Sequence, residues 1–390
     1  MKRVCLFLLF LLLFAAARGE GIAGLETRFA GERTEVLRHG KPLGFEDCLA
    51  EQLKAHPAMK AEDVLKLCVQ GACGPGHGKV IGEAARKSFD AEFSSASPRP
   101  DEPMFEFISP DFMRINLRAW KGRGLPSEWL FNMFSASARR FSDGDAVLKN
   151  ALDTAENLLA GERKADFIRL RRRMSGPGHH SEAYRKAERP SYRVVSTRFL
   201  FSLPVLARAA ALPETGGPRV IAVDGRAASG KTTLARQLAG IMNAGVVHMD
   251  DFFLPLVLRT PARYREPGGN VHYERFAAEV LPHLKKSGKF SYRTFDCSTM
   301  GYGKPAEVRD SGWRIVEGAY SLHPKFGDYA DLKVFYDISP EEQKRRIVRR
   351  NGEARYRVFK ERWIPLEENY IRSCGVVRRA DLVIGGRKQD

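Results

Sequence analysis

The residues with the clearest chemical meaning form one glycine-bearing segment in the second half of the chain. Gly225 begins the pattern G-x-x-x-x-G-K-T, which follows the apolar run 220–223. Glycines let the backbone turn tightly and aim its N–H groups at phosphate oxygens, and a helix that starts there adds its positive dipole end. Lys231 is placed to reach the terminal phosphates, and the Thr232 hydroxyl is placed to bind Mg²⁺. The predicted nucleotide-binding residues are Gly225, Arg226, Ala227, Ala228, Ser229, Gly230, Lys231, Thr232 and Thr233.

Acidic residues follow two further apolar runs. Asp250 and Asp251 come after the run 246–249, and Glu317 follows 314–316. Because ligands of an open parallel sheet lie beyond the carboxyl ends of its strands, we expect Asp250 near the phosphate loop and Glu317 near the Mg²⁺. A carboxylate at the position of Asp250 can orient a hydroxyl acceptor and take its proton as the bond to phosphorus forms. Capping of a helix N-terminus is the structural alternative for the two aspartates.

A basic helix is predicted to begin at Ser339. This residue suits the N-cap, Pro340 suits the first turn, and Glu342 suits the third helical position. One or two basic side chains of the helix could reach a transferring phosphoryl group and stabilise its charge, while others are expected to face solvent. The basic residues of this helix are Lys344, Arg345, Arg346, Arg349 and Arg350.

The chain around these motifs alternates apolar runs with helical segments. Continuous apolar strands interleaved with helices indicate a parallel sheet that helices cover on both faces. We therefore predict an α/β P-loop domain over 219–390, preceded by a glycine- and proline-rich linker at 213–218. The predicted strands are 220–223, 245–248, 314–316, 332–338 and 382–384.

The first half contains no strong motif and is predicted to form a mainly α-helical domain over 45–212. Amphipathic spacing and stops at glycine or proline indicate its helices. His179, His180 and Glu182 lack a second ligand pair at a recognised spacing, which favours surface or capping roles over a metal site. The helix candidates are 45–56, 61–73, 79–93, 126–142, 144–160 and 162–174.

Together, the phosphate loop, the segments 249–253 and 316–318, and the basic helix resemble the uridine kinase/phosphoribulokinase group of P-loop kinases. The likeness spans about 219–385, which is under half of the chain. The loop is specific for nucleotide binding, and the combination is moderately specific for this group. The helical first half resembles an uncharacterised extension of such kinases. Further segments are similar to bacterial proteins labelled uridine kinase-like: 266–270, 292–296, 362–368 and 380–383.

The resemblance implies ATP-dependent phosphoryl transfer to a hydroxyl of a small acceptor, with a nucleoside as the expected acceptor. It implies that Asp250 is the catalytic base and that Lys231 is a catalytic lysine that holds ATP. Thr232 and Glu317 would serve Mg²⁺. The lid of such kinases is mobile, and Arg349 or Arg350 would belong to it.

The candidate acceptor site departs from this family. Its expected residues are Asp251, Phe295 and Asp296, but Phe295 stands where the family has a tyrosine, and Cys297 follows the pair. A phenylalanine can stack on a base or pack on a sugar, but it cannot donate a hydrogen bond. Uridine or cytidine is therefore the default acceptor rather than a deduced one.

The composition leaves a second function open. Lysine and arginine number 64 against 47 aspartate and glutamate residues, and the net charge of +17 favours anionic partners. A regulatory or nucleic-acid-binding P-loop NTPase is therefore the alternative function. The sequence shows no zinc spacing, recognition-helix pattern or basic motif interleaved with aromatic residues, so we do not expect a nucleic-acid partner.

The N-terminus conflicts with an ATP-dependent function. Lys2 and Arg3 precede the apolar run 4–17, which resembles a signal peptide and is shorter than the ~20 residues of a membrane span. ATP and Mg²⁺ chemistry belongs in the cytosol, and six cysteines without a C-x-x-C pair fit a reducing compartment. We therefore expect a cytoplasmic protein without a membrane partner, whose leader at residues 1–20 is spurious or unprocessed.

Overall fold

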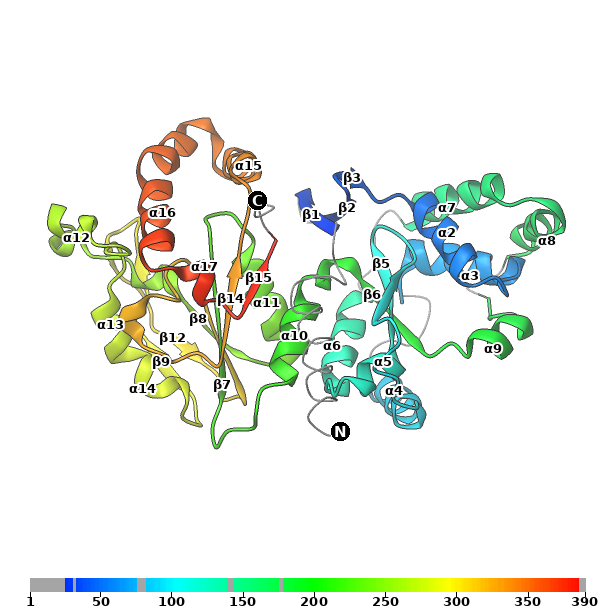
Figure 1. Ribbon diagram of the computed structural model, residues 1–390, viewed down its shortest axis with the longest axis horizontal. Coiled ribbons are helices and arrows are strands. Elements are labelled where there is room, and N and C mark those ends of the chain that lie inside the picture. The colour runs from blue at the N-terminus through cyan, green and yellow to red at the C-terminus, as the bar shows by residue number, and fades with distance from the viewer. Residues whose placement is uncertain (1–24, 31–32, 76–81, 139–143, 175–177, 386–390) are drawn as a thin grey trace, which may run out of the picture. The chain divides into compact units, whose positions relative to one another are not determined.

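The computed structural model divides the chain into two compact units that meet between Leu203 and Pro204, ahead of the linker predicted at 213–218. The leader predicted at 1–20 lies outside the described residues. The structure describes residues 25–30, 33–75, 82–138, 144–174 and 178–385 (Figure 1).

The C-terminal unit is built on a five-stranded sheet in the order β15-β14-β7-β13-β8. Every neighbouring pair is parallel, with Ala222 of β7 opposite Val316 of β13 and Val223 opposite Val334 of β14. Each strand coincides with a predicted apolar run, which confirms the α/β class predicted for this half. The strands are β7 (Arg219–Gly225), β8 (Gly245–His248), β13 (Trp313–Glu317), β14 (Leu332–Tyr336) and β15 (Leu382–Ile384).

Helices cover both faces of this sheet. Val220 and Ala222 of β7 join an apolar cluster with residues of α13, α16 and α17. Helix α11 packs on β7, β8 and β13, and Figure 1 shows it on the opposite side of the strands from α13 and α14. The helices of the unit are α10 (Ser202–Ala210), α11 (Lys231–Met242), α12 (Pro261–Arg265), α13 (Tyr273–Glu279), α14 (Leu281–Leu284), α15 (Pro340–Val358), α16 (Ile364–Ser373) and α17 (Val376–Arg379), with a π-helical turn η6 (Phe359–Trp363) between α15 and α16.

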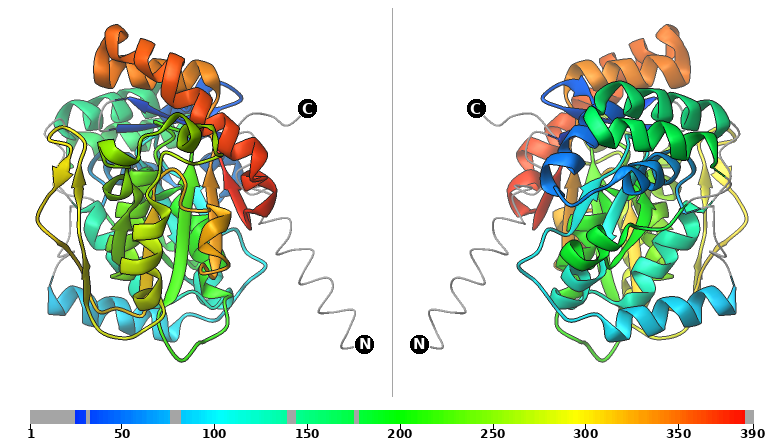
Figure 2. Two further views of the ribbon diagram at one scale, coloured as in Figure 1. Left: turned by 90° about the vertical axis from the view of Figure 1, so that its left-hand side faces the viewer. Right: turned by 90° about the vertical axis from the view of Figure 1, so that its right-hand side faces the viewer.

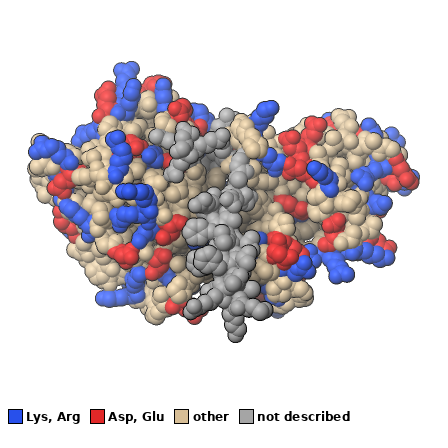
Figure 3. All heavy atoms as spheres, in the orientation of Figure 1, with Lys and Arg blue, Asp and Glu red and all other residues tan. Residues whose placement is uncertain are grey.

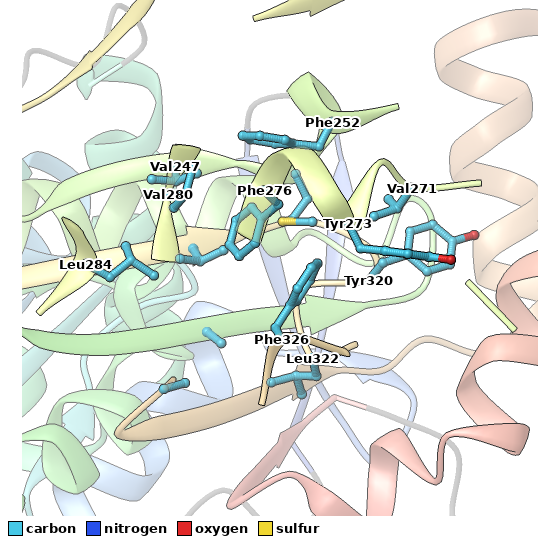
Figure 4. Close-up of a cluster of buried hydrophobic side chains, with 14 of the residues drawn as sticks. Val247, Phe252, Val271, Tyr273, Phe276, Val280, Leu284, Tyr320, Leu322 and Phe326 are labelled. Carbon is cyan, nitrogen blue, oxygen red and sulfur yellow. The ribbon is translucent and has the colours of Figure 1, made fainter. Parts of the chain in front are cut away.

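The apolar cluster anchors the segment that carries the two aspartates. The 3-10 turn η3 (Met249–Phe252) contains Asp250 and Asp251, and its Phe252 side chain is fully buried. The rings of Phe252 and Phe276 pack edge to face with their centroids 5.2 Å apart, and both lie in the cluster drawn in Figure 4. Burial of Phe252 therefore fixes the backbone from which Asp250 and Asp251 project.

Two short antiparallel pairs lie outside the main sheet. β9 (Phe290–Tyr292) pairs with β12 (Ala306–Val308), and β10 (Phe295–Asp296) pairs with β11 (Gly301–Tyr302). Because β10 contacts η3, the predicted acceptor residues Phe295 and Asp296 lie next to the segment that carries the aspartates. The remaining 3-10 turns of the unit are η4 (Leu256–Leu258) and η5 (Pro324–Phe326).

Helices form most of the N-terminal unit, as predicted. Helix α3 packs against α7 and α8, and α2 packs against α7, a group that faces the viewer in the right-hand view of Figure 2. Fully buried apolar side chains such as Val64 and Leu67 of α3 form the core between them. The helices are α2 (Phe45–Ala55), α3 (Ala61–Cys73), α4 (Glu83–Ser95), α5 (Leu117–Gly122), α6 (Ser127–Ser137), α7 (Gly144–Leu158), α8 (Gly161–Arg172) and α9 (Glu182–Glu188), with a 3-10 turn η2 (Thr197–Phe199).

The N-terminal unit also contains strands that the sequence pattern did not indicate. One antiparallel sheet has the order β4-β5-β6, and another has the order β1-β2-β3. The centre of β5 carries Arg114, which is 1% exposed, and a charge in mid-strand hides a buried strand from a hydrophobic pattern. The strands are β1 (Leu25–Ala30), β2 (Arg33–Arg38), β3 (Lys41–Pro42), β4 (Phe105–Phe107), β5 (Phe112–Asn116) and β6 (Tyr192–Ser196).

A hydrogen-bond network compensates the buried charge of Arg114. Its guanidinium donates to Gln70 Oε1 at 2.9 Å and lies 4.5 Å from the centre of the Tyr192 ring. Beside it, His180 bonds through Nδ1 to fully buried Asp63 at 2.9 Å and through Nε2 to the Tyr192 hydroxyl at 2.6 Å. The His180 side chain, 9% exposed, therefore forms part of this network rather than a metal site.

The surface that Figure 3 shows is mixed in charge, with Lys and Arg side chains interspersed among Asp and Glu in both units. Many of these groups form ion pairs within one helix, such as Lys149–Asp153 in α7. Among the residues that the structure describes, no helix has the length and hydropathy needed to span a bilayer.

Candidate active site

The phosphate loop leaves the central strand of the sheet and enters α11. Strand β7 ends at Gly225, and α11 begins at Lys231 directly after its N-cap, Gly230. Gly225 has φ +155°, and a Cβ at this position would lie 2.2 Å from the carbonyl oxygen of Tyr336. Ala228 and Gly230 also have positive φ, of 61° and 111°. A turn of this kind at a helix N-terminus is suited to binding phosphate through backbone N–H groups.

Arg226 anchors the loop to the end of the sheet and to α16. Its side chain is only 8% exposed, and its Nε donates to Glu368 Oε1 at 2.6 Å. A second ion pair joins the guanidinium to Asp337, which follows β14. The guanidinium of Arg226 is directed to these two carboxylates, so nucleotide binding by this residue stays a prediction for its backbone.

Side chains of helix α15 donate hydrogen bonds to backbone carbonyl groups in the next part of the loop. Gln343 Nε2 donates to the carbonyl oxygen of Ala227 at 3.1 Å, and Arg346 Nη1 donates to that of Ser229 at 2.8 Å. Figure 2 (left) shows α15 and α16, orange to red, together at one end of the unit. Among the basic residues of the predicted helix, Arg346 thus supports the loop rather than facing solvent.

Two buried carboxylates complete the support of the loop. Asp224 accepts hydrogen bonds from the Gly225 N–H at 2.7 Å and from the Tyr370 hydroxyl at 2.7 Å. Glu367 of α16 accepts from the Ala227 N–H at 2.9 Å and is 5% exposed. Burial raises the pKa of both carboxyl groups, and that of Glu367 reaches about 7. The loop is therefore held from outside by side chains of α15, α16 and β7.

The two predicted magnesium ligands lie together. The Thr232 hydroxyl donates to Glu317 Oε2 at 3.1 Å, and His248 Nδ1 is 2.6 Å from Glu317 Oε1. The hydrogen bond with Glu317 is the main cause that raises the pKa of His248. No group of three or more His, Cys, Asp or Glu side chains among the described residues could hold a metal alone. A hydroxyl and one carboxylate fit Mg²⁺, which completes its shell with phosphate oxygens and water.

Asp250 lies within the electrostatic field of this pair and of the phosphate loop. Its side chain is exposed, yet the surrounding protein removes part of its hydration, and this desolvation raises its pKa. Lys231 is the strongest group that opposes the rise in pKa. The charge of Glu317 raises the pKa of Asp250 further, whereas the charges of His248 and Arg350 lower it. Glu317 at the end of β13 lies opposite His248 of β8 and Val223 of β7, so the turn that carries Asp250 and the phosphate loop leave the sheet at the same edge.

Asp251 is held more firmly than Asp250. The Tyr292 hydroxyl donates to Asp251 Oδ2 at 2.9 Å and accepts from the His248 N–H at 3.1 Å. The Arg275 guanidinium donates to the Asp251 backbone carbonyl. Partial burial raises the pKa of Asp251, and the Tyr292 hydrogen bond opposes the rise. Asp251 therefore supports the turn that presents Asp250.

The predicted acceptor pair separates into a core residue and a turn residue. Phe295 is 5% exposed and packs edge to face on Tyr302 with ring centroids 5.8 Å apart. Asp296 is exposed and accepts from the Ser298 N–H at 2.7 Å. Of the two, Asp296 presents its carboxylate to solvent and Phe295 offers little free surface for stacking.

The two candidate lid arginines lie in α15, shortly before the point where this helix is interrupted. Arg349 and Arg350 are exposed, and Arg350 Nε donates to Asn351 Oδ1 at 2.7 Å. The helix is interrupted immediately afterwards at Gly352, where φ is +80° and ψ is +164°. The charge of Arg350 reaches Asp250, whose pKa it lowers.

Sequence reasoning missed the residues that support the loop from outside. Gln343, Glu367 and Tyr370 lie more than a hundred positions from the loop, and no spacing rule connects them to it. The only available signal was the acidic pair 367–368 within the segment 362–368 that resembles kinase sequences. His248 was noted only as part of a strand.

The C-terminal unit has a P-loop fold. The decisive observation is the loop 225–230 between the central parallel strand and a helix that begins at Lys231. This confirms the fold predicted from the sequence for this half.

Comparisons with known proteins found partial similarity to three proteins that are named as kinases. No protein-family model matches the chain. The chain is 26% identical over 145 residues to a cytidylate kinase from Pyrobaculum arsenaticum; these residues are 36% of this chain and span just under two thirds, 66%, of that protein. A "possible uridine kinase" from Bacillus stearothermophilus matches at 22% identity and a TM-score of 0.37, over 48% of this chain and 97% of that one. A "putative fructose transport system kinase" from Silicibacter sp. TM1040 matches at 23% and 0.40, over 48% and 98%.

Proposed function

We propose that the C-terminal unit catalyses ATP-dependent phosphoryl transfer to a hydroxyl group of a small acceptor. The observation that carries the proposal is the position of Asp250, in the turn that directly follows β8 at the edge of the sheet where Glu317 and the phosphate loop also lie. A phosphate loop alone would suit any nucleotide switch. An exposed carboxylate at the same edge of the sheet as the loop supplies what a switch does not need, a base for an alcohol.

In the proposed reaction, each of these residues has its own role. The loop N–H groups and Lys231 would bind the triphosphate, and Thr232 with Glu317 would hold Mg²⁺, which neutralises phosphate charge when bound. Asp250 would orient the acceptor hydroxyl and accept its proton as the oxygen attacks phosphorus. Arg349 or Arg350 would stabilise the charge of the transferring group.

A nucleoside is the acceptor that we propose to test first. The resemblance of the sequence motifs to uridine kinase-like proteins supports this order. The cytidylate kinase is named for a nucleotide, whose acceptor is a phosphate group, and so gives no support for a nucleoside hydroxyl. Sugars follow in the order of testing. Asp251 and Asp296 are the polar candidates for contact with the acceptor. We propose a cytoplasmic location because ATP and Mg²⁺ are available there.

The test measures ADP release by the full chain with Mg²⁺ and ATP, against nucleosides, sugars and pantothenate-like alcohols. One acceptor should raise turnover above the background rate. Asp250→Asn should lower that turnover about 10²–10⁴-fold with little change in nucleotide affinity, because it removes the base and leaves the loop intact.

The matched control is Asp166→Asn, the same change at an exposed ion pair of α8. This control should keep full turnover. If no acceptor raises ADP release, or if Asp250→Asn reacts as fast as the unmodified chain, the kinase proposal is wrong.

A further inference from the structure

Glu367 is a buried carboxylate directly behind the phosphate loop. It is 5% exposed, and its Oε2 accepts from the Ala227 N–H at 2.9 Å. An ionised carboxylate in such a place is costly unless an opposite charge compensates it. The identity of that opposite charge therefore matters for how the loop responds to a ligand.

The charged groups around Glu367 come from every element packed against it. Lys231 of α11 is the strongest group that favours its ionised form. Asp224 of β7 and Glu368 of α16 disfavour that form, and the Tyr320 hydroxyl, after β13, also senses its charge. Arg226 of the loop pairs instead with Glu368 and Asp337. Among the residues that the structure describes, no ion pair joins Glu367 to a cation, and Lys231 is the strongest favourable charge that acts on it at longer range.

An incoming triphosphate competes for this same lysine. The proposed function places the terminal phosphates against Lys231, and the ligand adds several negative charges to a site that already holds two buried carboxylates. Once Lys231 faces the phosphates, Glu367 loses its counter-charge and gains like charges nearby. Uptake of a proton from solvent restores its balance without breaking the Ala227 hydrogen bond, because the neutral acid keeps a carbonyl oxygen that accepts.

We propose that Glu367 is a positioning residue that holds the phosphate loop through Ala227 and takes up one proton when a nucleoside triphosphate binds. The inference rests on the proposed nucleotide site but not on the identity of the acceptor. In the empty site the ionised Glu367 carboxylate attracts Lys231, whose Nζ donates to the Arg226 carbonyl oxygen at 3.4 Å. In the filled site it becomes neutral and leaves the full lysine charge to the phosphates.

The direction of the pH effect follows from the empty state. Burial raises the pKa of Glu367 to about 7, so at pH 8 the carboxyl group is mostly ionised before binding. Binding should then take up about 0.9 proton, and affinity should fall as pH rises above 7. Relative to a variant without this charge, affinity should fall about 25-fold between pH 6.5 and pH 8.5.

The experiment is isothermal titration calorimetry of the full chain with Mg²⁺ and a non-hydrolysable ATP analogue at pH 8. Two buffers with different heats of ionisation report the number of protons taken up. Glu367→Gln keeps an oxygen that accepts from Ala227 but cannot titrate. Glu361→Gln, the same change at an exposed position before α16, is the matched control.

We expect proton uptake in the unmodified chain and in Glu367→Gln to differ by about 0.9, and Glu361→Gln to match the unmodified chain. Protonation of the nucleotide itself cancels in this difference. Equal uptake with and without Glu367 overturns the inference while nucleotide binding stands. If Glu367→Gln does not fold, uptake near zero in the unmodified chain overturns it. No nucleotide binding by the unmodified chain overturns the proposed function as well.

Discussion

Replacing Arg226 with methionine tests how strongly the phosphate loop depends on its anchor. The Arg226 side chain is 8% exposed, and its partners Asp337 and Glu368 are 12% and 23% exposed. Removing one partner of a fully buried ion pair costs about 3–5 kcal/mol, whereas exposed pairs contribute about 0–1 kcal/mol. Because both carboxylates keep some contact with water, we expect Arg226→Met to lower the stability of the C-terminal unit by about 2–3 kcal/mol.

Amide hydrogen exchange of the full chain, read by mass spectrometry, can locate this loss. Peptides of the loop and of α16 should exchange about 30–150-fold faster in Arg226→Met, while peptides of α3 in the N-terminal unit should not change. Arg226→Lys keeps the charge but cannot form two parallel hydrogen bonds to a carboxylate. Its exchange rates should therefore lie between those of the unmodified chain and those of Arg226→Met.

A double-mutant cycle makes the test specific to the ion pair. Once Glu368→Gln has removed one partner, Arg226→Met should cost less than it does alone, with a difference of about 1–2 kcal/mol. Unchanged exchange in Arg226→Met, or strictly additive effects of the two substitutions, would refute the reasoning that these groups hold the loop.

Two further predictions address a glycine and a buried acid. Gly225→Ala should lower stability by about 2–4 kcal/mol and weaken nucleotide binding, because the added Cβ would meet the Tyr336 carbonyl. Urea unfolding measures the first effect and calorimetric titration with nucleotide measures the second. Gly216→Ala, where the added Cβ would meet open space, should change neither. Burial alone would raise the pKa of Asp63, but hydrogen bonds led by that from His180 lower it to about 2. The ionised Asp63 carboxylate therefore stabilises the fold fully above its ordinary pKa of 3.8, and this contribution is lost as pH falls through about 2. We expect Asp63→Asn to lower the free energy of unfolding by about 2 kcal/mol at pH 7 and to change it little below pH 2. Hydrogen exchange or urea unfolding can measure this difference. A cost that does not vary with pH would contradict this second prediction.

The sequence predicted the C-terminal fold well because its signals are local. Buried parallel strands are continuous apolar runs, and the helix start at Ser339 is confirmed by its hydroxyl, which accepts from the Glu342 N–H at 3.2 Å. The same reasoning missed β5 because Arg114 sits in its middle. Only partners brought from other elements, Gln70 and Tyr192 among them, make that buried charge tolerable.

The chain by itself determined the chemistry of the loop, since a turn that binds phosphate needs glycines, a lysine and a hydroxyl at fixed short spacings. It also placed Asp250 and Glu317 at strand ends, where parallel strands bring side chains to one edge. Tertiary structure alone decided what stands behind the loop. Glu367 and Arg346 reach it from helices over a hundred residues away, and the properties of a buried carboxylate depend on distance and hydration, which a linear pattern does not record.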